Sequence, residues 1–434
     1  MKTRPWLAAL LMQKSNQLFA RFVTFYARLT AVKQQTRRLA VGVGTAALLL
    51  ALSSAPTPAH AAEITVGDGC TLVQAIISAN TDAIAPDSSC TAGDGADTIV
   101  LAGGTYSYDT AFGELYGSVT QSALPFITSE ITIEANDATI VRTDGNMRLF
   151  NVGDAGNLTL NSAIITGGEV NQRGGGILNS ATLTINNSTI SGNNADTGGG
   201  FESAGGTVVI NNSTITGNNA PNGGGGVYIG NGATVTLNRT IVSGNTANAG
   251  AEIRIIDGTL DAENRNVLGH SGLNDAQAFS GSTPGGTSVR ATSNGTNSTA
   301  LSSILNTTLA NNGGPTPTHA LVAGSPAIDL IPTTDPDCDA GVSTDQRGAV
   351  RAGEIDPGDG RGGLACDIGA HEVLSSETPT AVTLTAFTAN GGPALPGIMA
   401  VAFLLLLGVG TVWHKYVIRV NFIGSSGTQG VDKP

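Results

Sequence analysis

Charged side chains that could do chemistry are sparse in the repetitive middle of the chain. Residues 158–257 carry only Glu169, Arg173, Asp196, Glu202, Arg239, Glu252, Arg254 and Asp257. A polysaccharide lyase needs an Arg or Lys as base and carboxylates that hold Ca²⁺ against the uronate, whereas a glycoside hydrolase needs paired carboxylates. If the chain is an enzyme, Arg173 is the candidate base, and Asp196 with Glu202, on one coil but on either side of a glycine turn, is the candidate carboxylate pair.

A second group of oxygens could bind a metal ion. Asp335, Asp337 and Asp339 alternate along the sequence, which suits Ca²⁺. The following glycine comes one place late for the usual calcium loop and no Glu follows at the right spacing, so an exposed acidic turn is the alternative. Ca²⁺ is therefore a candidate ligand here, and no other cofactor is indicated.

The elements that must position these residues are strands of an internal repeat. Four segments align: LTLNSAIITGG from Leu158, LTINNSTISGN from Leu183, VVINNSTITGN from Val208 and VTLNRTIVSGN from Val235, at steps of 25, 25 and 27 residues. A period in the twenties, made of β-type residues and Gly/Asn turns, indicates a solenoid in which each repeat is one coil. Apolar residues recur in columns, so alternation along the strand predicts that these columns point inward. The fold class is therefore all-β, a right-handed parallel β-helix of about five to seven coils.

Asparagines recur in columns as well. The two columns are Asn161, Asn186, Asn211 and Asn238, and Asn193, Asn218 and Asn245. Asparagine tolerates left-handed turn geometry, and its amide can bond to its equivalent one coil away. We interpret both columns as structural ladders; a row of sugar-binding amides is the alternative. Glycine runs at 174–176, 198–200 and 223–226 predict a second turn in which only glycine avoids a Cβ clash.

The two ends of the sequence predict export and anchoring. The first 61 residues hold eight Lys and Arg and no acidic residue, and an apolar core is followed by Ala59-His60-Ala61, so we expect signal cleavage after Ala61. An uncleaved anchor, or a start at Met12, is the alternative. The uncharged run 395–413 has the length of a membrane-spanning helix, and the basic residues after it predict a cytoplasmic C-terminus.

The charge and cysteine content fit an exported protein. Residues 62–394 contain 32 Asp and Glu, ten Arg and no Lys, a net charge near −22, which makes nucleic acid a poor partner and leaves divalent cations and neutral glycans possible. The four cysteines suggest disulfides in an oxidising compartment. Three connectivities are possible, and the simplest pairs Cys70 with Cys90 and Cys338 with Cys366.

The flanks of the repeat complete the fold and carry a resemblance. Leu72, Ala75, Ile76 and Ala79 fall on one face of an amphipathic helix over 71–80, which we expect to cover the first coil, and the region from about 270 to 378 is expected to close the other end.

The stretch CTLVQAI from Cys70 resembles the CSLREA-type motif of bacterial surface β-helix proteins, with Thr71, Val73 and Gln74 in place of Ser, Arg and Glu. NNGGPTPTHAL at 311, GSPAID at 324, TDQRG at 344 and CDIGAHE at 366 resemble the choice-of-anchor Q domain. The resemblance implies a surface protein, many of whose relatives have no assigned activity.

These observations divide the chain into seven segments. They are a signal peptide (1–61), an N-terminal cap with the first strands (62–130), the β-helix repeats (131–270), a choice-of-anchor Q-like region (271–378), a linker (379–394), a membrane anchor (395–413) and a cytoplasmic tail (414–434). We expect a non-enzymatic, membrane-anchored cell-surface protein that acts as an adhesin-like, glycan-contacting or structural stalk. A polysaccharide lyase or hydrolase of pectate-lyase-like type is the alternative.

Overall fold

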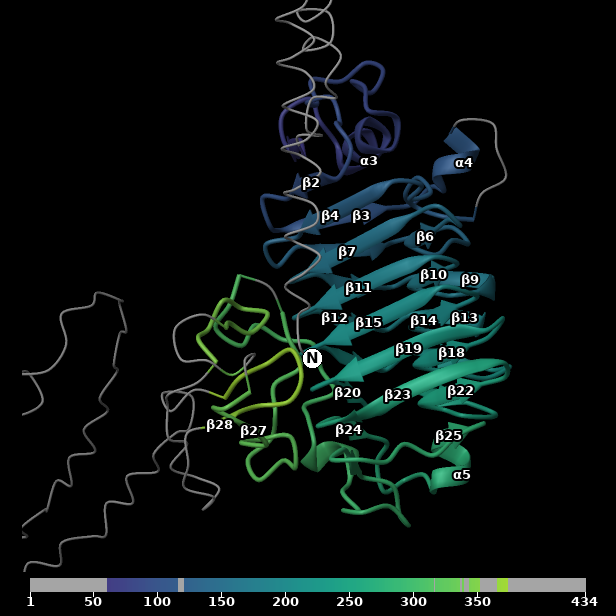
Figure 1. The fold of residues 1–434 in the computed structure, drawn as a ribbon, viewed down its shortest axis with the longest axis vertical. Coiled ribbons are helices and arrows are strands. Elements are labelled where there is room, and N and C mark those ends of the chain that lie inside the picture. The colour runs from purple at the N-terminus through teal and green to yellow at the C-terminus, as the bar shows by residue number, and fades with distance from the viewer. Residues whose placement is uncertain are drawn as a thin grey trace, which may run out of the picture. The chain divides into compact units, whose positions relative to one another are not determined.

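The repeat folds into a parallel β-solenoid (Figure 1). The computed structural model describes residues 61–115, 121–315, 317–335, 338, 343–351 and 365–373. The predicted signal peptide (1–61, apart from Ala61), linker (379–394), anchor (395–413) and cytoplasmic tail (414–434) lie outside these residues. In the described part of the chain, no helix combines the length and the apolar character needed to span a membrane.

Each complete coil contributes one strand to each of four parallel sheets, which we number in the order in which the coil visits them. Sheet 1 contains β1 (Glu63–Thr65), β2 (Asp97–Val100), β4 (Glu130–Glu134), β7 (Asn157–Asn161), β11 (Thr182–Asn186), β15 (Thr207–Asn211), β19 (Ala233–Asn238) and β23 (Gly258–Asn264). Sheet 2 contains β3 (Thr105–Tyr108), β5 (Thr139–Arg142), β8 (Ile164–Thr166), β12 (Thr189–Ser191), β16 (Thr214–Thr216), β20 (Ile241–Val242), β24 (Val267–Leu268) and β26 (Val289–Arg290).

The two remaining sheets are smaller. Sheet 3 contains β9 (Glu169–Arg173), β13 (Asn194–Thr197), β17 (Asn219–Ala220) and β21 (Thr246–Ala247). Sheet 4 contains β6 (Phe150–Val152), β10 (Ile177–Asn179), β14 (Phe201–Ser203), β18 (Val227–Ile229), β22 (Ile253–Ile255) and β25 (Phe279–Ser280). A short antiparallel pair, β27 (Ile331–Pro332) with β28 (Ala365–Cys366), and the helical segments α4 (Phe112–Leu115) and η1 (Leu301–Ser303) lie outside the four sheets.

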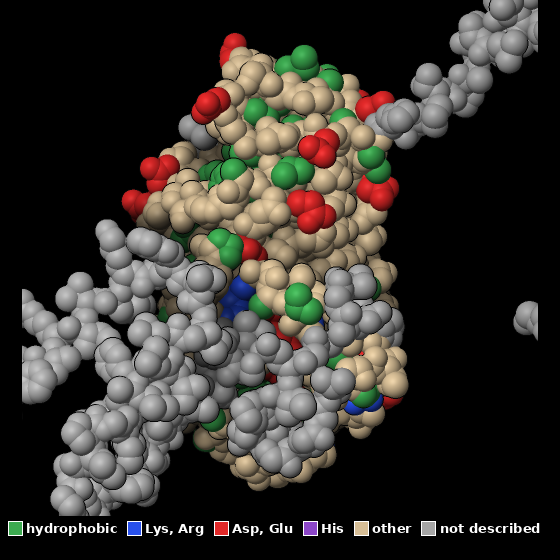
Figure 2. Space-filling model, turned by 90° about the vertical axis from the view of Figure 1, so that its left-hand side faces the viewer, with side chains coloured by type: hydrophobic (Ala, Val, Ile, Leu, Met, Phe, Trp, Pro, Cys, Tyr) green, Lys and Arg blue, Asp and Glu red, His purple; other side chains and the backbone are tan. Residues whose placement is uncertain are grey.

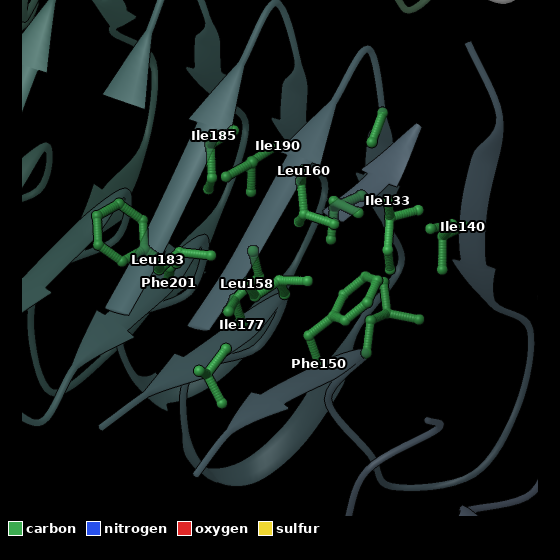
Figure 3. Packing of buried hydrophobic residues seen from close by; sticks show 14 of the residues in the cluster. Ile133, Ile140, Phe150, Leu158, Leu160, Ile177, Leu183, Ile185, Ile190 and Phe201 are labelled. Atoms are coloured by element: carbon green, nitrogen blue, oxygen red, sulfur yellow. The ribbon is translucent and has the colours of Figure 1, made fainter. Parts of the chain in front are cut away.

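The register between coils places like residues on like. Leu183 pairs with Leu158 and Val208, Ile185 pairs with Leu160 and Ile210, and Ile190 pairs with Ile165 and Ile215, which makes three columns. All of these side chains are buried, as predicted, and Figure 3 shows several of them side by side inside the solenoid. Stacking therefore converts each column into a continuous apolar ladder, in which one buried aliphatic side chain contributes roughly 1.5–3 kcal/mol. A fourth column on sheet 4 (Ile177, Phe201, Val227 and Ile253), which the sequence pattern did not single out, completes this core.

Glycine permits the close stacking of the turns between sheets 3 and 4. A Cβ on Gly175 would lie 2.5 Å from the carbonyl oxygen of Gly199, and a Cβ on Gly199 would lie 2.6 Å from that of Gly225. The backbones of successive coils therefore approach too closely for any side chain at these positions, as the glycine runs predict.

The N-terminal end is covered by the predicted helix. Helix α3 (Leu72–Thr81) begins with a capping box between Thr71 and Gln74, and its apolar face contacts β1, β2 and β4. The Thr71 hydroxyl accepts from Gln74 N and the Gln74 amide oxygen accepts from Thr71 N, so two N–H groups at the start of the helix are satisfied.

The C-terminal end differs from the expectation. Residues 270–300, with α5 (Asp275–Ala278), lie over the last coil, where Leu273 and Phe279 join the core. The described residues between Leu301 and Val373, which we call the lateral region, instead pack against the side of the solenoid (Figure 1). There Ile304, Ile331 and Ile368 form a second apolar cluster with Ile241 and Val267 of sheet 2. Polar side chains on the outside of this sheet make the lateral docking possible: Thr189 Oγ1 donates to Gln346 Oε1, and Ala370 N donates to Thr214 Oγ1.

The disulfide prediction is confirmed. Cys70 is bonded to Cys90 beside α3, and Cys338 is bonded to Cys366 within the lateral region. Each bond closes a local loop, of 20 and 28 residues respectively, which in the chain-entropy account contributes about 3 kcal/mol.

Candidate functional site

The structure brings together two of the three candidate catalytic residues. Arg173 ends β9 and Glu202 lies on β14, one coil further along; the Arg173 Nε atom is 2.5 Å from Glu202 Oε1. Thr197 Oγ1 donates to the other carboxylate oxygen at 2.6 Å. Asp196 lies on β13 with an exposed side chain that, within the described part of the chain, makes no hydrogen bond or ion pair.

The Glu202 carboxylate is a buried ion-pair partner of Arg173. Its side chain is 1 % exposed, and both carboxylate oxygens already accept hydrogen bonds. Arg148 is buried nearby, where its Nε atom donates to the carbonyl of Arg173, and burial lowers the pKa of Arg148 to about 10. A general base needs a lone pair that can reach a substrate proton. Because the Glu202 carboxylate is 1 % exposed and lies against Arg173 and Thr197, a substrate proton cannot reach its remaining lone pairs, while Arg173 remains 46 % exposed.

The candidate calcium residues are only partly described. Asp335 forms an ion pair with Arg239, with Oδ2 3.6 Å from Nη1, and Asp337 and Asp339 lie outside the described residues. Among described residues, no group of three or more His, Cys, Asp or Glu side chains is arranged to hold a metal ion.

Other charged residues of the lateral region form a buried network. Arg347 pairs with Asp345, and the carboxylate of Asp367 accepts hydrogen bonds from the backbone N–H groups of Asp329 and Val373. Burial raises the pKa of Asp367 to about 7 and lowers that of His371 to about 3. These groups therefore hold the fold of the lateral region together.

The inner asparagine column forms a continuous buried ladder. The Nδ2 atom of Asn193 donates to Asn218 Oδ1 at 3.0 Å, and that of Asn218 donates to Asn245 Oδ1 at 2.9 Å. The ladder ends on Glu252, which is fully buried and accepts hydrogen bonds from Asn245 Nδ2, Asn245 N and Gly244 N. Burial raises the pKa of Glu252 to about 7, although these hydrogen bonds act in the opposite direction.

The outer column forms a second ladder that runs the other way. From Asn264 through Asn238, Asn211, Asn186 and Asn161, each Nδ2 donates toward the N-terminal end, and the last donates to Glu134 Oε1 at 2.7 Å. In both ladders all amides point the same way and the donor end meets a carboxylate. Since aligned amide dipoles place partial positive charge at that end, a glutamate is the complementary terminus.

A pair of adjoining hollows at the N-terminal end was missed in the sequence. They have volumes of about 400 and 370 Å³ and share Thr71, Ser107 and Tyr108 in their walls. They lie between the start of α3 and β3, which in the described part of the chain pairs with β5 alone and is therefore an edge strand. The sequence signal is the alternation in TYSY at 105–108, which places two tyrosines on the same side of the strand.

The walls of these hollows combine apolar and hydrogen-bonding groups. Tyr106 and Tyr108 are partly exposed and also pack against the core, and burial raises the pKa of Tyr108. Ser107, Asp109 and Thr110 supply polar atoms along the same strand and just after it. Figure 2 shows several acidic side chains over the upper, N-terminal part of one side of the solenoid, whereas the few basic ones visible there lie lower on that face. We call these two hollows the β3 groove.

Comparison with known proteins adds no relative. The chain matches no protein-family model, no curated protein and no solved structure.

Proposed function

We propose that this protein is an exported, membrane-anchored surface protein of non-enzymatic character, and that the β3 groove binds a neutral glycan at the end of a rigid stalk. The two disulfides suit an oxidising compartment outside the cytoplasm. Two asparagine ladders and four apolar columns make the solenoid a rigid support. Nucleic acid remains an unsuitable partner for an ectodomain of this acidity.

The observation that carries the proposal is the composition of the groove. Its volume falls in the range of small-ligand sites, in which aromatic walls and a few fixed polar groups act together. A sugar offers C–H groups to an aromatic ring such as Tyr108 and hydroxyls to groups such as Ser107 and Asp109. The neighbouring carboxylates disfavour an anionic ligand, so a neutral glycan is the best chemical match.

At a finer level, we propose that the chain is a right-handed β-helix protein related to the CSLREA and choice-of-anchor Q surface proteins. The capping box at Thr71 and Gln74 supports the first assignment. Support for the second comes from Asp345 and Arg347 of TDQRG, which contact the backbone of Glu372 in CDIGAHE, so the two motifs form one packed unit.

A binding experiment tests the function. Residues 62–378, within one compact unit of the chain, would be screened on a glycan array with and without Ca²⁺, and positive ligands measured by calorimetry. Ser107→Trp places a bulky ring between the two hollows and should weaken binding about tenfold or more, equivalent to at least ~1.4 kcal/mol. Thr207→Trp, also at an exposed strand position but on sheet 1, is the matched control and should bind normally.

The alternative activity is tested on the same protein. A lyase would release an unsaturated product from uronate polymers, detected by its absorbance, and turnover would be lost in Arg173→Ala. Such a result, or equal glycan binding by Ser107→Trp and wild type, would overturn the proposal. The buried ion pair between Glu202 and Arg173 argues against lyase activity.

A further inference from the structure

A buried carboxylate near the start of the solenoid is incompletely paired. Asp97, the first residue of β2, is 2 % exposed. Its Oδ1 atom accepts hydrogen bonds from the backbone N–H groups of Ala62 and Asp94, at 3.2 and 2.9 Å. Its Oδ2 atom is buried without a hydrogen-bond partner, and no cation among the described residues forms an ion pair with it. A buried carboxylate with two neutral donors and no cation is costly.

Ala62 is held in place beside this carboxylate. The Ala62 carbonyl accepts a hydrogen bond from Thr98 N at 2.8 Å, and Glu63 pairs with Thr98 as β1 joins the edge of sheet 1. Ile64, two residues further on, is fully buried in the core. The nitrogen atom of Ala62 therefore faces Asp97 because strand pairing fixes it there.

Ala62 is also the residue that follows the small-x-small sequence Ala59-His60-Ala61. Hydrolysis of the Ala61–Ala62 amide by a signal peptidase adds one water, leaving a carboxylate on Ala61 and an amine on Ala62. Near neutral pH this amine takes up a proton, because an α-amino group has a pKa of about 7.7–8.0. The single amide N–H that faces Asp97 then becomes an ammonium group with three N–H donors and a positive charge.

We propose that the mature chain begins at Ala62 and that its α-ammonium group forms a buried ion pair with Asp97. Cleavage supplies the cation that the carboxylate lacks, and a charge-assisted hydrogen bond is roughly twice as strong as a neutral one. Processing thereby fastens β1 and β2 beneath α3. The neighbouring carboxylates of Glu63, Asp94 and Glu130 are exposed, so water screens their effect on this amine.

The absence of lysine makes the proposal directly testable. Residues 62–378 contain no Lys, so the α-amine of a chain that begins at Ala62 is its only primary amine. Such a chain can be released from an N-terminal fusion by a protease that leaves no extra residue. The rate of its reaction with trinitrobenzenesulfonate, measured against pH, reports the pKa of this one group.

We expect the folded chain to show an amine pKa at least one unit above its value in urea, and labelling at pH 8 about fivefold slower than in Asp97→Asn. Asp94→Asn is the matched control, because Asp94 bonds to Asp97 through its backbone only, and it should label at nearly the wild-type rate. Equal labelling of folded wild type and Asp97→Asn would overturn the ion pair.

Two further measurements guard against a variant that fails to fold. A Gly-Ser extension before Ala62 moves the charge away and should lower the thermal midpoint by a few degrees at pH 7; an unchanged midpoint would count against the proposal. Mass spectrometry of the exported protein should give an N-terminus at Ala62, and a start at any other residue would refute it.

Discussion

The inner asparagine ladder makes one prediction that separates buried from exposed hydrogen bonds at neighbouring residues. Asn218 is fully buried, and its side chain takes part in five hydrogen bonds. It accepts from the backbone and side-chain nitrogens of Asn193 and donates to Ile190 O, Thr216 O and Asn245 Oδ1. The next residue, Asn219, has a partly exposed side chain with two hydrogen bonds, to Asn194 and from Thr246.

Asn218→Ala removes all five bonds inside a site that water does not reach. The Asn193 N–H group is left buried without an acceptor, which alone costs about 1–3 kcal/mol, and the other lost bonds each contribute about 0.5–1.5 kcal/mol. We therefore expect a loss of at least about 3 kcal/mol in the free energy of unfolding. Asn219→Ala should cost less than about 1 kcal/mol, because water replaces the lost partners.

Urea unfolding of residues 62–378, followed by circular dichroism, measures both variants under the same conditions. Asn218→Ala should shift the unfolding midpoint to clearly lower urea concentration, while Asn219→Ala stays near wild type. If the two substitutions cost the same, the ladder is not a principal source of stability and the reasoning from burial is wrong.

Two other perturbations follow from the same structure. The folded pKa of Glu252, about 7, lies above its ordinary value of 4.5, so its contribution favours folding at low pH and is lost as pH rises through 7. Relative to Glu252→Gln, wild type should therefore lose about 2.5 kcal/mol of unfolding free energy between pH 5 and 8, and a pH-independent difference in urea titrations would contradict this. Gly199→Ala places a Cβ 2.5 Å from Asn219 O and should prevent normal stacking of the coils, whereas the Cβ in Gly217→Ala meets only Gly192 N, at 3.8 Å. Since φ at Gly217 is +67°, Gly217→Ala should still cost about 1 kcal/mol; thermal midpoints that do not separate the two variants would refute the steric account.

Features that repeat, or that act locally, could be predicted from the sequence. The coil period, the inward columns such as Leu158 to Val235, and the glycine turns follow because each coil meets the same neighbours about 25 residues away. Helix α3 follows from its own apolar spacing, and the two disulfides from the short separation of their cysteines. In each case the physical cause lies in a pattern that one stretch of sequence contains.

Contacts that occur once were decided by the tertiary structure. Gln346 reaches Thr189 across 157 residues, so no periodicity could show that the lateral region covers sheet 2 instead of the end of the solenoid. Glu252 ends the inner ladder although it stands in no asparagine column, because the turn after β21 brings its carboxylate back to Asn245. Likewise, Asp97 meets Ala62, and the β3 groove forms, only where α3 and the first strands pack together. The sequence by itself thus determined the repeating unit, whose contacts are periodic, while the single contacts that complete the ends and the side of the solenoid depend on how distant segments pack.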